Sequence, residues 1–227
     1  MTTGTRRPRR AAAVEPAGAR ARLDALTLRA PPAVLSSRPR LHQLEPPTLL
    51  VRFYHPAHGP WYRQRAYGPL PEVRFDHHLP PSGAHQARSL WYASTSLIGA
   101  LAEAFGSLGF VDKGSGRRVC LVRIRLPLSL LDLVGAGPRV FGLDQRLATS
   151  REYGRCQEWA RAFYEAYPSI HGLRWRGREA GSLCCALNGR VDMASLALVA
   201  DHDLGHPDVW PRIARAARRC HLRIVAP

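Results

Sequence analysis

Apolar positions along the chain follow two different periods, which predict short strands interrupted by a few helices. The run Leu49–Tyr54 is rich in β-branched and aromatic residues, as strands are. Within 118–126, apolar side chains occupy every second position, which indicates a strand with one buried face. The segment 151–167 instead repeats apolar residues at helical spacing. The hydroxyls of Ser94, Thr95 and Ser96 can cap a helix, which predicts one over Leu97–Phe105. Further strands are expected at 73–76, 89–93, 172–176, 183–187, 195–200 and 221–225, and a last helix at 211–220.

The order of these elements predicts the fold class and the domain organisation. Strands and helices do not alternate regularly, which favours an α+β fold with mixed or antiparallel sheets and flanking helices. Residues 1–46 are rich in Arg, Ala and Pro and show no sustained period. Such a segment buries too little apolar surface to offset the entropy lost on ordering. We therefore expect a disordered tail over 1–46 and one folded domain over 47–227.

Composition and residue spacing indicate where the protein resides and whether a metal site is expected. No stretch approaches the roughly 20 apolar residues of a membrane span, and the N-terminus has no apolar signal core, so a soluble cytoplasmic protein is expected. The five cysteines have no paired spacing, which argues against a disulfide framework and structural zinc. Among the ten histidines, His202 and His206 have helical spacing, but Gly205 and Pro207 argue against a helix there. No metal site is expected.

The formal net charge of +16 raises the possibility of nucleic-acid binding. Lys113 is the only lysine among 33 basic residues, a bias typical of a GC-rich genome. Residues 1–45 carry nine arginines against three acidic residues, and the rest of the charge forms no basic stripe. Direct nucleic-acid binding is therefore the less favoured interpretation. It stays open as part of an alternative: a basic module without catalysis that binds nucleic acid or a protein.

Glu103 is the most informative residue for chemistry. It is the only charged residue in the otherwise apolar helix Leu97–Phe105. A helix of this composition is normally buried, and an unpaired buried carboxylate is costly. A partner cation, a water-filled cleft or a ligand would compensate the charge. The alternatives are an ion pair that only joins two elements, and a helix face that is wetter than its composition suggests.

Two arginines pose a similar question. Arg52 interrupts the apolar strand Leu49–Tyr54, so it faces either solvent at an edge or a cleft. Arg74 lies in a compact Val-Arg-Phe-Asp segment surrounded by loop. Arginine forks match phosphate oxygens, and two of them could hold a pyrophosphate. A solvated charge is the alternative for each.

The order of these residues resembles the RES domain, which bacterial toxin-antitoxin modules use as the toxin. The resemblance covers most of residues 48–200. The segments that carry it are Leu-Val-Arg52-Phe-Tyr, Val-Arg74-Phe-Asp, Leu-Trp-Tyr92-Ala-Ser-Thr-Ser-Leu-Ile-Gly-Ala-Leu-Ala-Glu103-Ala-Phe, Gly142-Leu-Asp, Tyr153-Gly-Arg-Cys-Gln157-Glu-Trp159-Ala and Gly172-Leu-Arg-Trp-Arg-Gly-Arg178.

The resemblance implies an ADP-ribosyltransferase-like fold that binds NAD in a cleft. It further implies that NAD is split, with inorganic phosphate as acceptor in some members, or that ADP-ribose is transferred to a protein. A small helix-turn-helix antitoxin of the Xre-like type is the implied partner, with nucleic acid reached only through it. By position, the resemblance assigns catalysis to Glu103 and Arg52, and NAD binding to Arg52, Tyr62, Arg74, Tyr92 and Arg178.

One position departs from the family pattern. The serine in the family's name is expected within the segment that ends at Arg178, where this sequence has Gly177. Ser182 lies close by in sequence, although no spacing argument requires it to substitute. The family's glycines before the second arginine are replaced by Glu72 and Val73. These departures bear on the rate of the implied reaction, on its acceptor, and on whether the protein is active.

Overall fold

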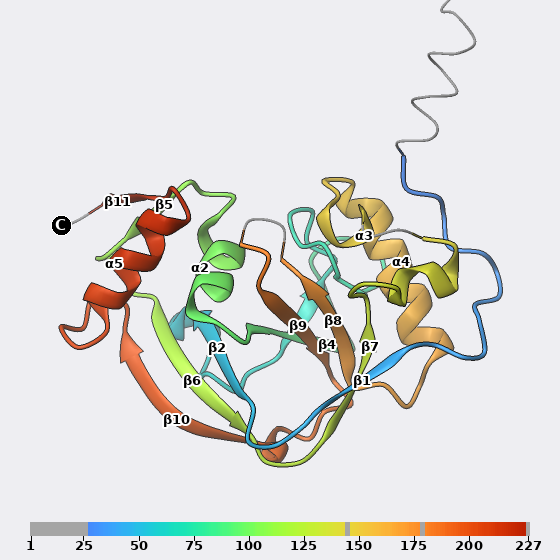
Figure 1. Cartoon of the computed structure of the whole chain (residues 1–227), viewed down its shortest axis with the longest axis horizontal. Coiled ribbons are helices and arrows are strands. Elements are labelled where there is room, and N and C mark those ends of the chain that lie inside the picture. The colour runs from blue at the N-terminus through green and yellow to red at the C-terminus, as the bar shows by residue number, and fades with distance from the viewer. Residues whose placement is uncertain (1–26, 144–145, 178–179, 226–227) are drawn as a thin grey trace, which may run out of the picture.

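A computed structural model describes residues 27–143, 146–177 and 180–225. Its centre is a strongly curled sheet of nine strands in the order β1-β7-β8-β9-β4-β2-β6-β10, with β3 paired to β4 (Figure 1). Neighbouring strands are antiparallel except for β7 and β8, which run parallel. The strands are β1 (Leu41–Leu44), β2 (Leu49–Tyr54), β3 (Arg65–Gly68), β4 (Ala84–Ser94), β6 (Arg118–Ile124), β7 (Leu128–Asp132), β8 (Gly172–Arg176), β9 (Leu183–Asn188) and β10 (Leu196–Asp203).

Helices flank the sheet in two groups (Figure 1). The first group is α2 (Leu97–Phe105) with α5 (Trp210–Arg219), beside a small parallel sheet of β5 (Phe110–Asp112) and β11 (Arg223–Val225). The second group is α3 (Arg146–Thr149) with α4 (Tyr153–Ala166). The short 3-10 turns are η1 (Pro56–His58), η2 (Gly137–Phe141) and η3 (Met193–Ser195). This arrangement confirms the expected α+β class.

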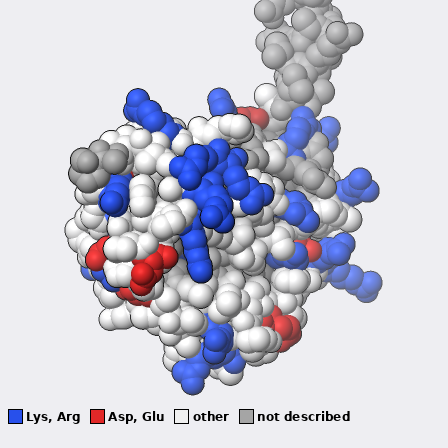
Figure 2. Space-filling model, turned by 60° about the vertical axis from the view of Figure 1, so that its left-hand side comes forward, with Lys and Arg blue, Asp and Glu red and all other residues white. Residues whose placement is uncertain are grey.

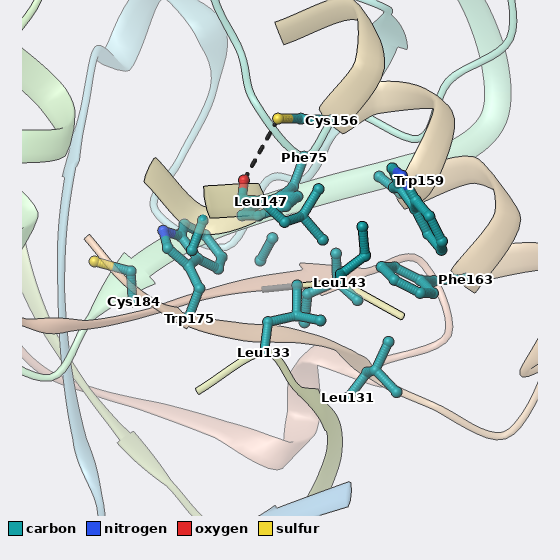
Figure 3. Packing of buried hydrophobic residues seen from close by; sticks show 14 of the residues in the cluster. Phe75, Leu131, Leu133, Leu143, Leu147, Cys156, Trp159, Phe163, Trp175 and Cys184 are labelled. Carbon is teal, nitrogen blue, oxygen red and sulfur yellow. Dashed lines mark hydrogen bonds between the residues drawn. The ribbon is translucent and has the colours of Figure 1, made fainter. Parts of the chain in front are cut away.

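Three buried clusters form the core. The first lies between the sheet and α4, and it contains Phe75, Trp159, Phe163 and Trp175 (Figure 3). A second fills the inside of the curled sheet around Leu50 and Trp91. The third joins α2 to α5 around Phe105. Successive side chains of a strand point to opposite faces, so a strand such as β2 contributes to the second and third clusters alternately.

Two expectations about the chain before β4 are wrong. Residues 27–46 belong to the folded domain, because Leu28 is buried and β1 pairs with β7. Residues 1–26 lie outside the described residues. The extended piece expected at 73–76 is a turn, because the Asp76 carboxylate accepts hydrogen bonds from the backbone on both sides of it and bends the chain.

Candidate active site

A cleft opens where β2 and β4 diverge. These neighbouring strands are paired only through Val51 and Ser94, while β2 pairs with β6 along its whole length. The cleft has a volume of about 590 Å³, within the usual range for sites that bind small molecules and cofactors. Its floor comes from β2, β4, β8 and β9, one wall from the C-terminal half of α2, and the other from residues 72–75 and 151–153.

Arg52 bridges the gap between the diverging strands. Its NH1 donates to the Tyr92 carbonyl at 3.2 Å, and its guanidinium lies 5.0 Å from the ring centroid of Trp91. Burial lowers the pKa of Arg52 to about 10, so the side chain remains a cation at neutral pH. Its Nε is buried without a partner among the described residues. Arg52 therefore both holds the divergent strands together and adds positive charge to the cleft lining.

Arg74 lies on the wall opposite α2, in the turn that follows β3. Its Nε donates to the Ser150 carbonyl at 3.1 Å, and its guanidinium lies 5.5 Å from the centroid of the Tyr153 ring. The next residue, Phe75, is fully buried against Trp175, with ring centroids 4.8 Å apart. The turn is thus anchored in the core, and its arginine points to the cleft.

Glu103 lies on the α2 wall and is exposed rather than buried. The helix buries Gly99, Ala100, Leu101, Ala102 and Phe105 instead. Its N-cap is Ser96, whose hydroxyl accepts from the Gly99 amide at 3.0 Å. Burial of the carboxylate was the wrong expectation, because the helix turns this position toward the cleft. The exposure of this position fits two of the alternatives, a water-filled cleft and a helix face that is wetter than its composition suggests.

Gly177, which stands where the family serine was expected, lies directly against Glu103. A Cβ added at Gly177 would be 2.6 Å from Glu103 Oε1 and 3.1 Å from Cys184 Sγ. The missing side chain therefore creates the space that the carboxylate uses. Ser182 does not take the place of the serine, since its hydroxyl contacts Ser96 Oγ at 2.9 Å and it is not part of the cleft lining.

The cleft floor carries two aromatic residues with unused polar atoms. The Tyr92 hydroxyl and Trp175 Nε1 are buried and have no partner among the described residues. Their rings meet edge to face at 6.2 Å, and Figure 3 shows Trp175 and Cys184 at one side of the α4 cluster. Burial raises the pKa of Tyr92, and the charge of Asp76 adds to the effect, so the phenol stays protonated. Buried polar atoms without partners are rare, and here they suit a bound ligand or water.

The structure places one of the two remaining candidates from the sequence, Tyr62, away from the cleft lining. Tyr62 is 51% exposed and is not among the residues that line it. The adjacent Trp61 turns inward, where its carbonyl accepts from Trp91 Nε1, and this directs Tyr62 outward against the Trp61 ring. Arg178 lies outside the described residues. Arg52, Arg74, Tyr92 and Glu103 come from separate segments of the chain and line one cleft.

The sequence did not single out several residues of the lining. Arg117 and Arg151 add two more cations, and Tyr153 and Trp175 add aromatic surface. Among the described residues, four arginines and two glutamates line the cleft, which favours an anionic ligand. No pattern distinguished Arg117 or Arg151 among so many arginines. The outer surface is also basic, and Figure 2, with the α5 side turned forward, shows lysine and arginine side chains gathered near the middle of that face.

The thiol of Cys184 lines the cleft but is not activated as a nucleophile. Burial raises the pKa of the Cys184 thiol to about 12, with Glu103 adding to the effect, so it is not a thiolate at neutral pH. Within the described ranges, no group of three or more His, Cys, Asp or Glu residues could hold a metal ion. In the same part of the chain, no helix is long and apolar enough to cross a membrane.

Comparison with known proteins finds matches to a family model and to solved structures. A scan against protein-family models matches the RES domain over residues 49–206. Among solved structures, the fold resembles the crystal structure of the M.tuberculosis MbcT-MbcA toxin-antitoxin complex, with a TM-score of 0.55 and 18% identity over 76% of this chain and 92% of that chain. Among curated proteins, no sequence matches significantly. The matched family range contains all four candidate residues of the cleft and ends before α5.

Proposed function

Because the chain belongs to the RES domain family, we propose that it is a toxin-type enzyme that cleaves the bond between nicotinamide and ribose in NAD. The observation that carries the proposal is the meeting of Arg52, Arg74, Tyr92 and Glu103 in one cleft of about 590 Å³. Two of these residues are cations, Arg52 on the floor and Arg74 on a wall, one is a partly buried aromatic, and one is an exposed carboxylate.

These residue types suit the proposed reaction. As the glycosidic C–N bond breaks, its electron pair leaves with nicotinamide and positive charge develops on the ribose. The Glu103 carboxylate, presented from the α2 wall, is positioned to stabilise that charge. Arg74 and Arg52 supply donors for the pyrophosphate, and the Tyr92 and Trp175 rings offer surface on which a planar base can pack. An acceptor oxygen then forms the new bond to the ribose and releases its proton.

The acceptor is phosphate, water or a protein side chain. Arg117 and Arg151 leave additional positive charge in the lining beyond the two arginines assigned to the pyrophosphate. The test is NAD consumption by the purified protein with and without inorganic phosphate, followed by NMR of the products. Phosphorylated ADP-ribose would identify phosphorolysis, and free ADP-ribose would identify hydrolysis. Protein labelled with ADP-ribose would identify transfer. Intact NAD both with and without phosphate, from folded protein, would reject the proposal.

An antitoxin that covers the cleft is the proposed partner. The similar fold was solved as a toxin-antitoxin complex, and the family resemblance points to a small helix-turn-helix protein of the Xre-like type. Such a protein would neutralise the toxin by excluding NAD. Co-purification with the product of an adjacent gene, together with loss of NAD turnover on binding, is the expected result.

One observation favours the alternative of a basic binding module. Helix α5 buries its apolar residues and exposes Arg212, Arg215, Arg218 and Arg219. If nucleic-acid binding is the function, it will weaken steeply with salt and be lost when these four arginines are replaced by glutamine. The proposed enzyme would keep its NAD turnover in that variant, because none of the four lines the cleft.

A further inference from the structure

The turn that carries Arg74 is built around a buried carboxylate. Asp76 is fully buried, and its Oδ2 accepts from the Leu70 amide and from Arg65 NH2, both at 2.8 Å. Its Oδ1 accepts from the His78 amide at 3.2 Å and from His78 Nδ1 at 2.5 Å. The bond to Leu70 joins the two ends of the segment 70–76, so this carboxylate closes the loop.

Neighbouring elements hold the same loop from two other sides. The side-chain amide of Gln157, on α4, donates to the carbonyls of Leu70 and Val73 at 2.7 and 2.8 Å. His78 also donates from Nε2 to the Arg88 carbonyl on β4 at 2.9 Å, which ties the exit of the loop to the sheet. The loop thus has few alternative conformations, although it has no regular secondary structure.

The local sequence leaves space for this network at one glycine. A Cβ added at Gly68 would lie 2.8 Å from both Asp76 Oδ2 and His78 Nδ1, and 2.9 Å from Arg65 NH1. Burial alone would raise the pKa of Asp76, but His78 and Arg65 hold it at about 2, so the carboxylate is ionised. A buried charge with this many donors is costly to disturb.

We propose that Asp76 is a positioning residue for Arg74, and that the Asp76 carboxylate with Arg65 and His78 fixes the loop that presents this arginine to the cleft. Asp76 itself is not among the residues that line the cleft. The inference rests on the proposed function, in which Arg74 binds the pyrophosphate of NAD. In this proposal, a network lying behind the cleft wall holds the arginine in place.

The first test compares NAD kinetics of Asp76→Asn, Arg74→Ala and the double variant. If Asp76 acts through Arg74, Asp76→Asn raises KM for NAD about tenfold or more and changes kcat much less. The double variant is then no worse than Arg74→Ala within about a factor of two, because coupled residues are not additive. Effects that multiply, or a loss confined to kcat, would overturn the proposal.

The second test needs no NAD, and so separates this inference from the proposed function. Amide hydrogen exchange of segment 69–77 is measured in wild type, Asp76→Asn and Gly68→Ala, with Arg65→Gln as a milder variant should those two not fold. Faster exchange confined to this segment is expected. The matched control is Asp132→Asn, a buried carboxylate with its own arginine partners, Arg40 and Arg174. Unchanged protection of 69–77 in every folded loop variant would overturn the proposal, even if NAD is cleaved.

Discussion

At the scale of single residues, the polar exceptions within apolar elements were the useful signal. Glu103 and Arg52 each interrupt an apolar segment, and both line the cleft. Arg117 and Arg151 interrupt nothing and went unnoticed among the other arginines. The burial of Glu103 was predicted wrongly because composition alone does not say which side of a short helix faces a cleft. Which arginines a ligand meets depends on contacts distant in sequence.

Gly177 gives a direct test of how closely Glu103 must approach β8. In Gly177→Ala, the new methyl group would overlap Glu103 Oε1 and displace the carboxylate. Because small displacements of catalytic groups are costly, kcat for NAD cleavage should fall by roughly 10- to 100-fold. The control is Gly154→Ala on α4, where an added Cβ meets no atom within 4 Å. Wild-type turnover in Gly177→Ala would show that the position of Glu103 is not critical.

His77 gives a prediction about pH. Burial lowers its pKa from 6.5 to about 3, with the charge of His78 adding to the effect. Between these pH values the unfolded chain takes up a proton that the folded protein does not, so stability falls as the pH drops from about 6.5 toward 3. In His77→Phe, stability at pH 7 is retained, since His77 stacks on Tyr164 and its Nε2 has no partner among the described residues.

The measurement is the free energy of unfolding in urea between pH 7 and pH 4. The variant should show a clearly shallower decline than wild type over this range. The remaining acid sensitivity at lower pH includes Asp76, whose pKa is held at about 2 and whose contribution is lost below about pH 4. Parallel curves for the two proteins would contradict the assignment of the acid sensitivity to His77.

At the scale of elements, the sequence predicted the longer helices and strands well, whereas several short strands were missed. β2 and α2 have the bounds that the pattern indicated. β1, β3 and β5 have four residues or fewer, too few for a period to be recognised, and they are held mainly by strand pairing. Segment 27–44 was assigned to the tail because residues 1–46 are rich in Arg, Ala and Pro and show no sustained period. It is nevertheless held by the pairing of β1 with β7 and by individual hydrogen bonds. Trp159 Nε1 donates to the Arg29 carbonyl at 2.8 Å, and the Tyr167 hydroxyl donates to the Ser36 carbonyl at 2.6 Å.

Deletion of residues 1–45 is therefore expected to destabilise the domain. It removes β1 and two buried leucines, Leu28 and Leu44. Burial of such a side chain contributes about 1.5 to 3 kcal/mol, so the free energy of unfolding should fall by several kcal/mol. Deletion of residues 1–26 keeps every contact described here and serves as the control. Equal stability of the two truncated proteins, measured in urea, would contradict a structural role for 27–45.

At the scale of the whole molecule, the fold class followed from the order of elements, but the cleft did not. The cleft depends on the divergence of β2 from β4 beyond Val51 and Ser94. It also needs α2 and the Arg74 turn on its two walls. These pairings join segments far apart in sequence, which local patterns do not encode. The family resemblance supplied the order of the key residues, and the structure supplied the packing that brings four of them together.

The most direct measurement is NAD cleavage by Glu103→Gln, compared with wild type at equal thermal stability. Loss of the carboxylate charge, with little change in size, should lower kcat by about 100-fold or more. The control is Glu158→Gln, which changes a carboxylate that pairs with Arg155 on α4, outside the cleft lining. Turnover that falls only in Glu103→Gln is the predicted result. Wild-type turnover in folded Glu103→Gln would contradict a catalytic cleft centred on this residue.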